Sequence, residues 1–228
     1  MRLHRLHVIV PVVLAALGAP ATARADTGGA EAGQAEPSRA SASAGQVSVS
    51  TRPGGLVGRT KTFRGAIPAG DAGRTVTVER YDELAAQWLA IARATAGEDG
   101  AFAARWKPDR TGPLRVRARV EAAGAAAAAA APELGITLYK AATATWYGPG
   151  FYGRKTACGQ RMSRTLLGVA HKTRPCGTQI SFLYRGRTIT VPVVDRGPFA
   201  NGAQWDLTAA ASETLGFRTT GTIGALQR

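Results

Sequence analysis

Residues 179–199, QISFLYRGRTITVPVVDRGPF, indicate most clearly how the C-terminal part of this chain folds. Gln179–Leu183 and Thr188–Val194 are rich in β-branched and aromatic residues and predict two strands. Between them, Tyr184–Arg187 contains a glycine and predicts a hairpin turn. Upstream, Leu167–His171 predicts a further strand. These segments indicate a sheet built from short strands.

One short helix is expected after these strands. It should begin at Asp206-Leu207 and run to Gly216 through alanines, which favour helix. Thr208 or Asp206 can accept hydrogen bonds from its first backbone N–H groups, and Gly216 suits a left-handed C-terminal stop. Several strands with one short helix predict an all-β domain, a small closed barrel, over residues 141–228.

Residues 46–121 show the period of β-strands. Leu114–Val120 alternates apolar and polar residues without a break, and Gly/Pro/Asp-rich turn signals separate the strand-like stretches. The pattern predicts a small β-sandwich. A tryptophan strand at Trp88–Ala94, an Asp99-Gly100 turn and an aromatic strand at Phe102 resemble bacterial immunoglobulin-like modules, in that order. The resemblance implies an immunoglobulin-like domain.

The N-terminal sequence predicts export. A basic start and the apolar run Val8–Leu17 precede Ala23-Arg24-Ala25, a signal-peptidase pattern, so residues 1–25 are predicted to be a signal peptide. The apolar run is shorter than the roughly 20 residues that span a bilayer; an uncleaved anchor is the alternative. Both cysteines lie far from the cleavage site, so we expect a secreted, wall-associated protein, not a lipoprotein, with no integral membrane segment after cleavage.

Two segments of simple composition separate these parts. Residues 26–45 are rich in Ala, Gly, Ser and Glu and lack large apolar side chains, which predicts a disordered lead-in. Residues 122–140 begin with an alanine run that Pro132 ends, and they predict an Ala-rich linker between the two domains.

The two cysteines of the chain are Cys158 and Cys176. In an exported protein such a pair is most simply a disulfide, because oxidising compartments favour pairing. It would close a loop of 17 intervening residues, for which the chain-entropy argument gives about 3 kcal/mol. The alternative is a nucleophilic Cys158 assisted by His171, although no Asn or Asp is clearly placed to orient that histidine.

The chain carries a net charge of +14. Such a charge favours polyanionic partners, which for an exported protein are anionic wall polymers, peptidoglycan carboxylates or lipid head groups. The arginines are scattered singly, without the basic cluster and reader motif of a nucleic-acid-binding protein, so no nucleic-acid partner is expected. No His/Cys/carboxylate cluster has metal-ligand spacing, so we expect no metal and no cofactor.

Six motifs carry a resemblance to a known family: TWYGPGFYG at 145–153, TACG at 156–159, GVAHKT at 168–173, CGT at 176–178, VDRGPF at 194–199 and WDLT at 205–208. In this order and spacing they resemble the rare-lipoprotein-A-like (RlpA-like) double-psi β-barrel proteins, a septal-ring lytic transglycosylase family. The resemblance covers nearly all of residues 143–228 and implies a six-stranded double-psi β-barrel. Enzymes of this family cleave peptidoglycan glycan strands and leave 1,6-anhydro sugar ends.

The reaction implied by the resemblance needs a carboxyl group. That group protonates the departing glycosidic oxygen and then takes the proton of the sugar's own 6-hydroxyl. Asp195, at a strand end before an Arg-Gly-Pro turn, is the first candidate, and Asp206 is the second. Purely structural roles are the alternative: Asp195 would pair with Arg196 or with backbone amides, and Asp206 would cap the helix.

Further residues of these motifs are candidates for binding the sugar. Aromatic rings on Gly/Pro-rich turns either stack on sugars or fill a core, and the sequence leaves both roles open. His171 is more typical of a satisfied core or groove histidine than of a proton carrier. The candidates are Trp146, Tyr147, Phe151, Tyr152, Gln160, His171, Arg196 and Phe199.

Gln160 departs from the family pattern, because the enzymes carry a glutamate at this position. Glutamine can hydrogen-bond a sugar but cannot transfer a proton at neutral pH. The sequence therefore favours a peptidoglycan lytic transglycosylase that acts through Asp195, with Asp206 assisting and peptidoglycan glycan strands as partner. The alternative is a non-catalytic, expansin-like wall-binding or wall-loosening module. A third reading is a barwin-like secreted ligand of another protein.

Overall fold

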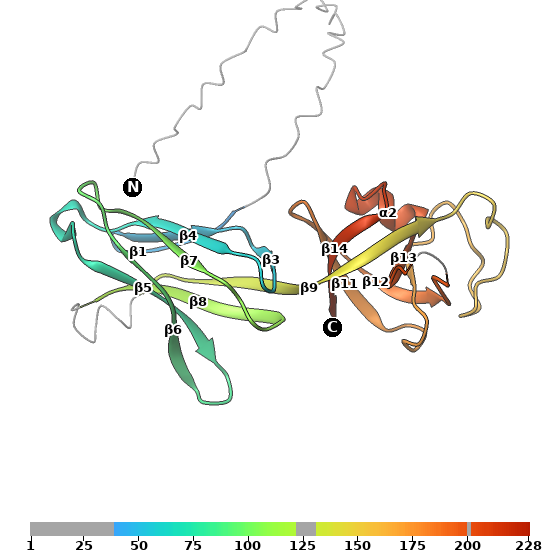
Figure 1. Cartoon of the computed structure of the whole chain (residues 1–228), viewed down its shortest axis with the longest axis horizontal. Coiled ribbons are helices and arrows are strands. Elements are labelled where there is room, and N and C mark those ends of the chain that lie inside the picture. The colour runs from blue at the N-terminus through green and yellow to red at the C-terminus, as the bar shows by residue number, and fades with distance from the viewer. Residues whose placement is uncertain (1–38, 122–130, 200–201) are drawn as a thin grey trace, which may run out of the picture. The chain divides into compact units, whose positions relative to one another are not determined.

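The computed structural model describes residues 39–121, 131–199 and 202–228 (Figure 1). The predicted signal peptide, most of the predicted lead-in and the alanine run lie outside these residues. Within them, no helix has the length and apolar character needed to cross a membrane.

The N-terminal part consists of strands in two layers, and their pairings are antiparallel except for that of β3 with β9. The first sheet has the order β1-β2-β4-β7, and the second joins β6, β5, β8 and the first half of β9. Side chains of both sheets, among them Phe63, Val78 and Val116, form one buried core. The strands are β1 (Ala40–Ala44), β2 (Val47–Thr51), β3 (Gly54–Leu56), β4 (Lys61–Ala66), β5 (Thr75–Asp82), β6 (Gln87–Thr95), β7 (Ala101–Trp106), β8 (Gly112–Val120) and β9 (Glu133–Tyr147), with a 3₁₀ turn, η1 (Ala69–Asp71).

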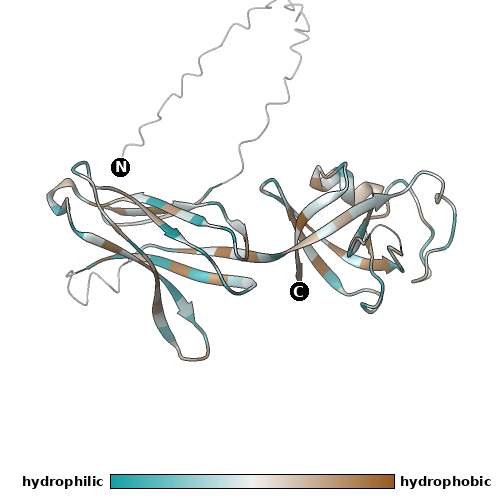
Figure 2. Ribbon diagram, in the orientation of Figure 1, coloured by the Kyte–Doolittle hydropathy of each residue, from teal (hydrophilic) through white to brown (hydrophobic). Residues whose placement is uncertain are grey.

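Apolar and polar residues alternate along these strands (Figure 2), as the sequence pattern required. In β8, for example, Val116, Ala118 and Val120 are buried while the arginines between them are not. The two-layer arrangement is the expected sandwich, whereas the immunoglobulin-like assignment stays a prediction.

Two predicted boundaries differ from the structure. Strand β1 occupies Ala40–Ala44, inside the segment 26–45 predicted to be disordered. It forms there because its backbone pairs with that of β2, which needs no large side chains. Strand β9 begins at Glu133, inside the predicted linker 122–140, because Leu134 and Ile136 pack into the sandwich core. The β-structure of the N-terminal part therefore extends into the predicted lead-in through β1 and into the predicted linker through β9.

The C-terminal part is a closed six-stranded barrel. The strands follow the order β13-β10-β12-β11-β14-β9, and β13 also pairs with β9, which closes the sheet on itself. Apolar side chains from all six strands fill its interior, including Val169, Phe182, Val193 and Leu207. The new elements are β10 (Val169–Ala170), β11 (Gln179–Tyr184), β12 (Arg187–Asp195), β13 (Trp205–Thr208), α2 (Ala209–Leu215) and β14 (Gly221–Gln227).

Helix α2 ends at Gly216 as predicted, but it begins at Ala209 and not at Asp206-Leu207. Thr208 is its N-cap and its Oγ1 accepts a hydrogen bond from the backbone N–H of Ala211, while Gly216 ends the helix in the left-handed conformation at φ 74°. Asp206 is not a helix residue or a cap, because it lies within strand β13 and pairs on both sides.

Candidate functional site

Strand register places the two predicted aspartates on one face of the barrel. Ala170 of β10 lies opposite Asp195 of β12 on one side and opposite Asp206 of β13 on the other. Residues directly opposite each other on paired strands point to the same face. Two strand spacings separate the Cα atoms of the two aspartates, which amounts to about 10 Å. The carboxyl groups therefore share one outer surface, on either side of a small residue.

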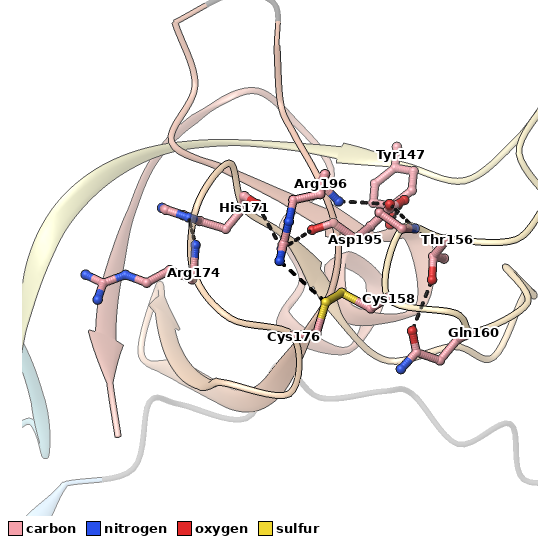
Figure 3. Close-up of a disulfide and its surroundings, with 10 residues drawn as sticks. Tyr147, Thr156, Cys158, Gln160, His171, Arg174, Cys176, Asp195 and Arg196 are labelled. Carbon is pink, nitrogen blue, oxygen red and sulfur yellow. Dashed lines mark hydrogen bonds between the residues drawn. A yellow bond between two sulfur atoms is a disulfide. The ribbon is translucent and has the colours of Figure 1, made fainter.

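Asp195 is fixed by three hydrogen bonds. Its Oδ1 accepts from the backbone N–H of Ala157 at 2.8 Å and from that of Arg196 at 2.8 Å, and its Oδ2 accepts from the Tyr147 hydroxyl at 3.2 Å (Figure 3). The side chain forms no ion pair with Arg196 among the described residues. The predicted backbone partners are present, and the carboxyl group is held in a single orientation.

Asp206 is partly buried. Its Oδ1 accepts a hydrogen bond from Thr145 Oγ1 at 2.6 Å, which β9 places directly opposite it. Burial raises the pKa of Asp206 above its usual value, and the charge of Asp195 raises it further, while the Thr145 hydrogen bond lowers it. Asp206 therefore retains a proton at a higher pH than an exposed aspartate does.

Tyr147 connects the Asp195 carboxyl group to an aromatic surface. Burial raises the pKa of its phenol, and the neighbouring Asp195 charge adds to that effect. The neutral hydroxyl donates to Asp195, and the ring meets Phe151 edge-on with centroids 5.7 Å apart. Phe151 is 48% exposed, so its ring remains accessible beside the carboxyl groups.

Trp146 points away from this group, although it is the neighbour of Tyr147 in sequence. Successive side chains of a strand face opposite sides. Trp146 instead lines a separate hollow with Ala209, Ser212 and Glu213 of α2. Tyr152 also has a partner of its own, since the Arg164 guanidinium lies 5.2 Å above its ring. Phe199 is 80% exposed at the end of the Arg-Gly-Pro turn.

Gln160 is exposed and belongs to a tight local turn. Its Oε1 accepts a hydrogen bond from Thr156 Oγ1 at 3.0 Å, and its backbone carbonyl accepts from the Thr156 N–H at 2.7 Å. In Figure 3 Thr156 lies between Gln160 and Asp195. Within the described residues Gln160 does not hydrogen-bond to either aspartate.

The cysteines form the predicted disulfide, with Cα atoms 5.6 Å apart, which rules out the nucleophilic reading of Cys158. It lies beside Arg196, whose Nη2 approaches Cys176 Sγ at 3.5 Å and whose Nη1 donates to the His171 carbonyl at 3.4 Å.

His171 is held by its own loop. Its Nδ1 accepts from the backbone N–H groups of Thr173 and Arg174, so the neutral ring carries its proton on Nε2. Its ring lies 4.4 Å from that of Trp205. Burial lowers its pKa, and Arg174, Arg196 and Lys172 lower it further.

Sequence reasoning missed Thr145 and Thr156, the hydroxyl partners of Asp206 and Gln160. Both stand inside quoted motifs, but only the β9–β13 register and the local turn bring them to those partners. No group of three or more metal-ligating side chains occurs in the described parts of the chain.

Residues 139–225 match the protein family described as "Lytic transglycolase". The probable endolytic peptidoglycan transglycosylase RlpA of Synechocystis is 43% identical over 84 residues, 36% of this chain and 26% of that protein. The endolytic peptidoglycan transglycosylase RlpA of Campylobacter jejuni is 42% identical over 81 residues, 35% of this chain and 30% of that protein. Residues 139–225 form an RlpA-like double-psi β-barrel.

The RlpA-like barrel accounts for only part of each relative, because the chain spans about a quarter to a third of their lengths. The solved Streptomyces papain inhibitor is 27% identical over 37% of this chain and 91% of its own, with a TM-score of 0.29, too low to bear on the fold. The RlpA-like barrel contains both aspartates, the disulfide and Gln160, so the candidate site lies entirely within the matched region.

Proposed function

We propose that this chain is an exported peptidoglycan lytic transglycosylase that cleaves glycan strands to 1,6-anhydro ends, with Asp195 and Asp206 as its catalytic residues. The strand register that sets Asp195 and Asp206 on either side of Ala170 carries the proposal, because it brings two carboxyl groups with different hydrogen-bond partners to one surface. Two titratable groups whose environments differ are the usual basis for separate acid and base roles.

The environments of the two aspartates indicate which one acts as the acid and which one as the base. Asp206, whose pKa burial raises, supplies the proton to the departing glycosidic oxygen as the bond to the anomeric carbon breaks. The 6-hydroxyl oxygen of the same sugar then bonds to the anomeric carbon, and its proton passes to the oriented carboxylate of Asp195. Proton exchange with solvent restores the starting state. This refines the sequence expectation, in which Asp195 performed both transfers with Asp206 assisting.

The sugar-binding roles follow from exposure and position. Phe151 and Phe199 offer accessible rings for stacking on sugar faces. Tyr147 orients Asp195, and Gln160 offers an exposed amide to sugar hydroxyls. The polymer is extracytoplasmic peptidoglycan, the substrate that the names of the RlpA relatives specify. Secretion through residues 1–25 remains part of the proposal.

Gln160 favours a second candidate function. If a carboxyl group at this position is indispensable, the barrel binds glycan strands without cutting them and acts as a wall-binding or expansin-like loosening module. The exposed Gln160 amide and the net charge of +14 suit such binding.

Product analysis tests the proposal. Purified, peptide-stripped sacculi are incubated with residues 26–228, which contain every described residue, and soluble products are analysed by mass spectrometry. We expect anhydro-glycans from the wild type and at least about a hundredfold less from Asp195→Asn and from Asp206→Asn. Asp109→Asn, an exposed change in the sandwich, is the matched control. Wild-type protein that pellets with sacculi but releases no anhydro products would support the binding module instead.

A further inference from the structure

A pocket opens on the barrel near the two aspartates, and neither aspartate lines it. It has a volume of about 470 Å³, and β9, β14, the loop after β10 and the segment before β13 contribute to it, together with Thr111 before β8. Its floor is made of buried side chains: Ala142, Ala203, Trp205 and Ala225. An apolar floor of this kind suits the carbon face of a sugar ring.

The rim of this pocket is cationic. Lys140, Lys172 and Arg174 all line it, and all three are exposed. None of the lining residues is acidic, and none of the three cationic side chains forms an ion pair with another described residue. Three uncompensated cations around an apolar floor favour an anionic group on the ligand.

His171 adds a neutral donor to the same rim. Because its Nδ1 already accepts two backbone N–H groups, Nε2–H is the group that remains for a ligand. A donor beside three cations fits an oxygen-rich anion.

Two hydrogen bonds connect a residue of the pocket, His171, with Asp195 and its neighbour Arg196. The His171 N–H donates to the Asp195 carbonyl at 3.1 Å, and Arg196 Nη1 donates to the His171 carbonyl at 3.4 Å. Figure 3 shows His171 and Arg174 on one side of Arg196, and Tyr147 and Asp195 on the other. A polymer bound across Arg196 therefore has one repeat at the aspartates and a neighbouring repeat at the cationic rim.

We propose that this pocket binds a carboxylate-bearing repeat of the glycan strand, with Lys172 and Arg174 pairing with the carboxylate and the apolar floor supporting the sugar ring. The choice of polymer rests on the proposed function. The charged group of a peptidoglycan repeat is a carboxylate, either the lactyl group of a peptide-free muramic acid or the end of a stem peptide.

A binding comparison tests this proposal. Residues 26–228 carrying Asp195→Asn, so that no ligand is consumed, are titrated calorimetrically with three probes. The first is a peptide-free tetrasaccharide of alternating N-acetylglucosamine and N-acetylmuramic acid, the second is chitotetraose, which lacks the carboxylates, and the third is the muramic tetrasaccharide with its lactyl groups joined to stem peptides. The pocket variant is Lys172→Gln/Arg174→Gln. Its control is Arg105→Gln/Lys107→Gln, which removes the same charge from exposed positions of the sandwich.

We expect the muramic tetrasaccharide to bind at least about fivefold more tightly than chitotetraose, as two accessible ion pairs predict. The pocket variant should lose that difference and the control variant should keep it. A preference over chitotetraose that only the stem-peptide probe shows assigns the carboxylate to the peptide, and one that only the peptide-free tetrasaccharide shows assigns it to the lactyl group. A preference that both probes show means that the pocket accepts either carboxylate. Equal binding of all three probes, or equal losses in both double variants, would overturn the proposal. Failure of the wild type to release anhydro products would overturn the proposed function alone, because this titration does not depend on cleavage.

Discussion

Gln160→Glu is the substitution that most sharply separates cutting from binding. Gln160 is exposed, and its Oε1 accepts a hydrogen bond from Thr156 Oγ1 at 3.0 Å. A glutamate of the same shape keeps this bond and converts it to a charge-assisted one, a gain of about 1 kcal/mol at most. The variant should therefore fold, and its free energy of unfolding should change by less than about 1 kcal/mol.

The expected effect on catalysis is small. If Asp206 supplies the proton and Asp195 removes the other, a third carboxyl group has no transfer left to perform. The rate should then change by less than about threefold, because a missing acid or base accounts for about 10²- to 10⁴-fold and none is missing. If the rate is instead limited by a proton carrier lost at Gln160, the same substitution should raise it by about that factor.

The assay is the initial rate of formation of anhydro ends from peptide-stripped glycan, measured for the wild type and Gln160→Glu at equal folded fraction. Gln87→Glu, the same chemical change at an exposed position of β6, controls for the added negative charge. A rise of a hundredfold or more in Gln160→Glu, absent from Gln87→Glu, would refute the assignment of both proton transfers to the aspartates.

Three further outcomes concern stability. Burial lowers the pKa of Lys61 from 10.5 to about 8, so between these pH values the unfolded chain binds more protons than the native state. The free energy of unfolding should therefore rise by about 2 kcal/mol from pH 8 to pH 10. Urea titrations should show this rise in the wild type and not in Lys61→Met. Replacing Cys158 and Cys176 by serine should cost about 3 kcal/mol, measured as a lower urea midpoint that a reductant reproduces in the wild type. Burial raises the pKa of Asp206, so just above pH 3.8 the native state binds more protons than the unfolded state, and the contribution of Asp206 to stability is lost as the pH rises. The Asp206→Asn variant should not show this loss and should be at least as stable as the wild type at pH 7. The same dependence of unfolding free energy on pH in both proteins would contradict the burial argument.

The barrel could be predicted from the sequence because its signals are local. The strands on either side of Tyr184–Arg187 and the Thr208 and Gly216 ends of the helix depend on residue types within a few positions. The start of the helix was less accurate, since Asp206 was assigned to the helix although it pairs in β13. Pairing with β9 and β10 outweighed the local preference for a helix start, and such pairing is not a local property.

The candidate site could be predicted only in part. Asp195 and Tyr147 were both named from motifs, and they are in hydrogen-bond contact. Trp146 was grouped with Tyr147, yet strand alternation directs it toward α2. The sequence could have predicted that Trp146 and Tyr147 face opposite sides, because side chains alternate along a strand that includes Thr145–Tyr147. The hydrogen-bond partner of Asp206 could not be predicted from the sequence, because Thr145 lies 61 positions away.

Closure of the barrel and assembly of the candidate site are the same structural event. The β9–β13 pairing closes the sheet, and its register sets Thr145 opposite Asp206 and Tyr147 opposite Thr208. A slip of one residue in this register would turn the Thr145 hydroxyl inward and expose Ala144, which is fully buried. The packing that keeps Ala144 and Leu207 inside the barrel therefore also fixes the two side chains that orient the aspartates. For this reason the geometry of the site depends on the core of the barrel more than on the loops that carry most of its sequence motifs.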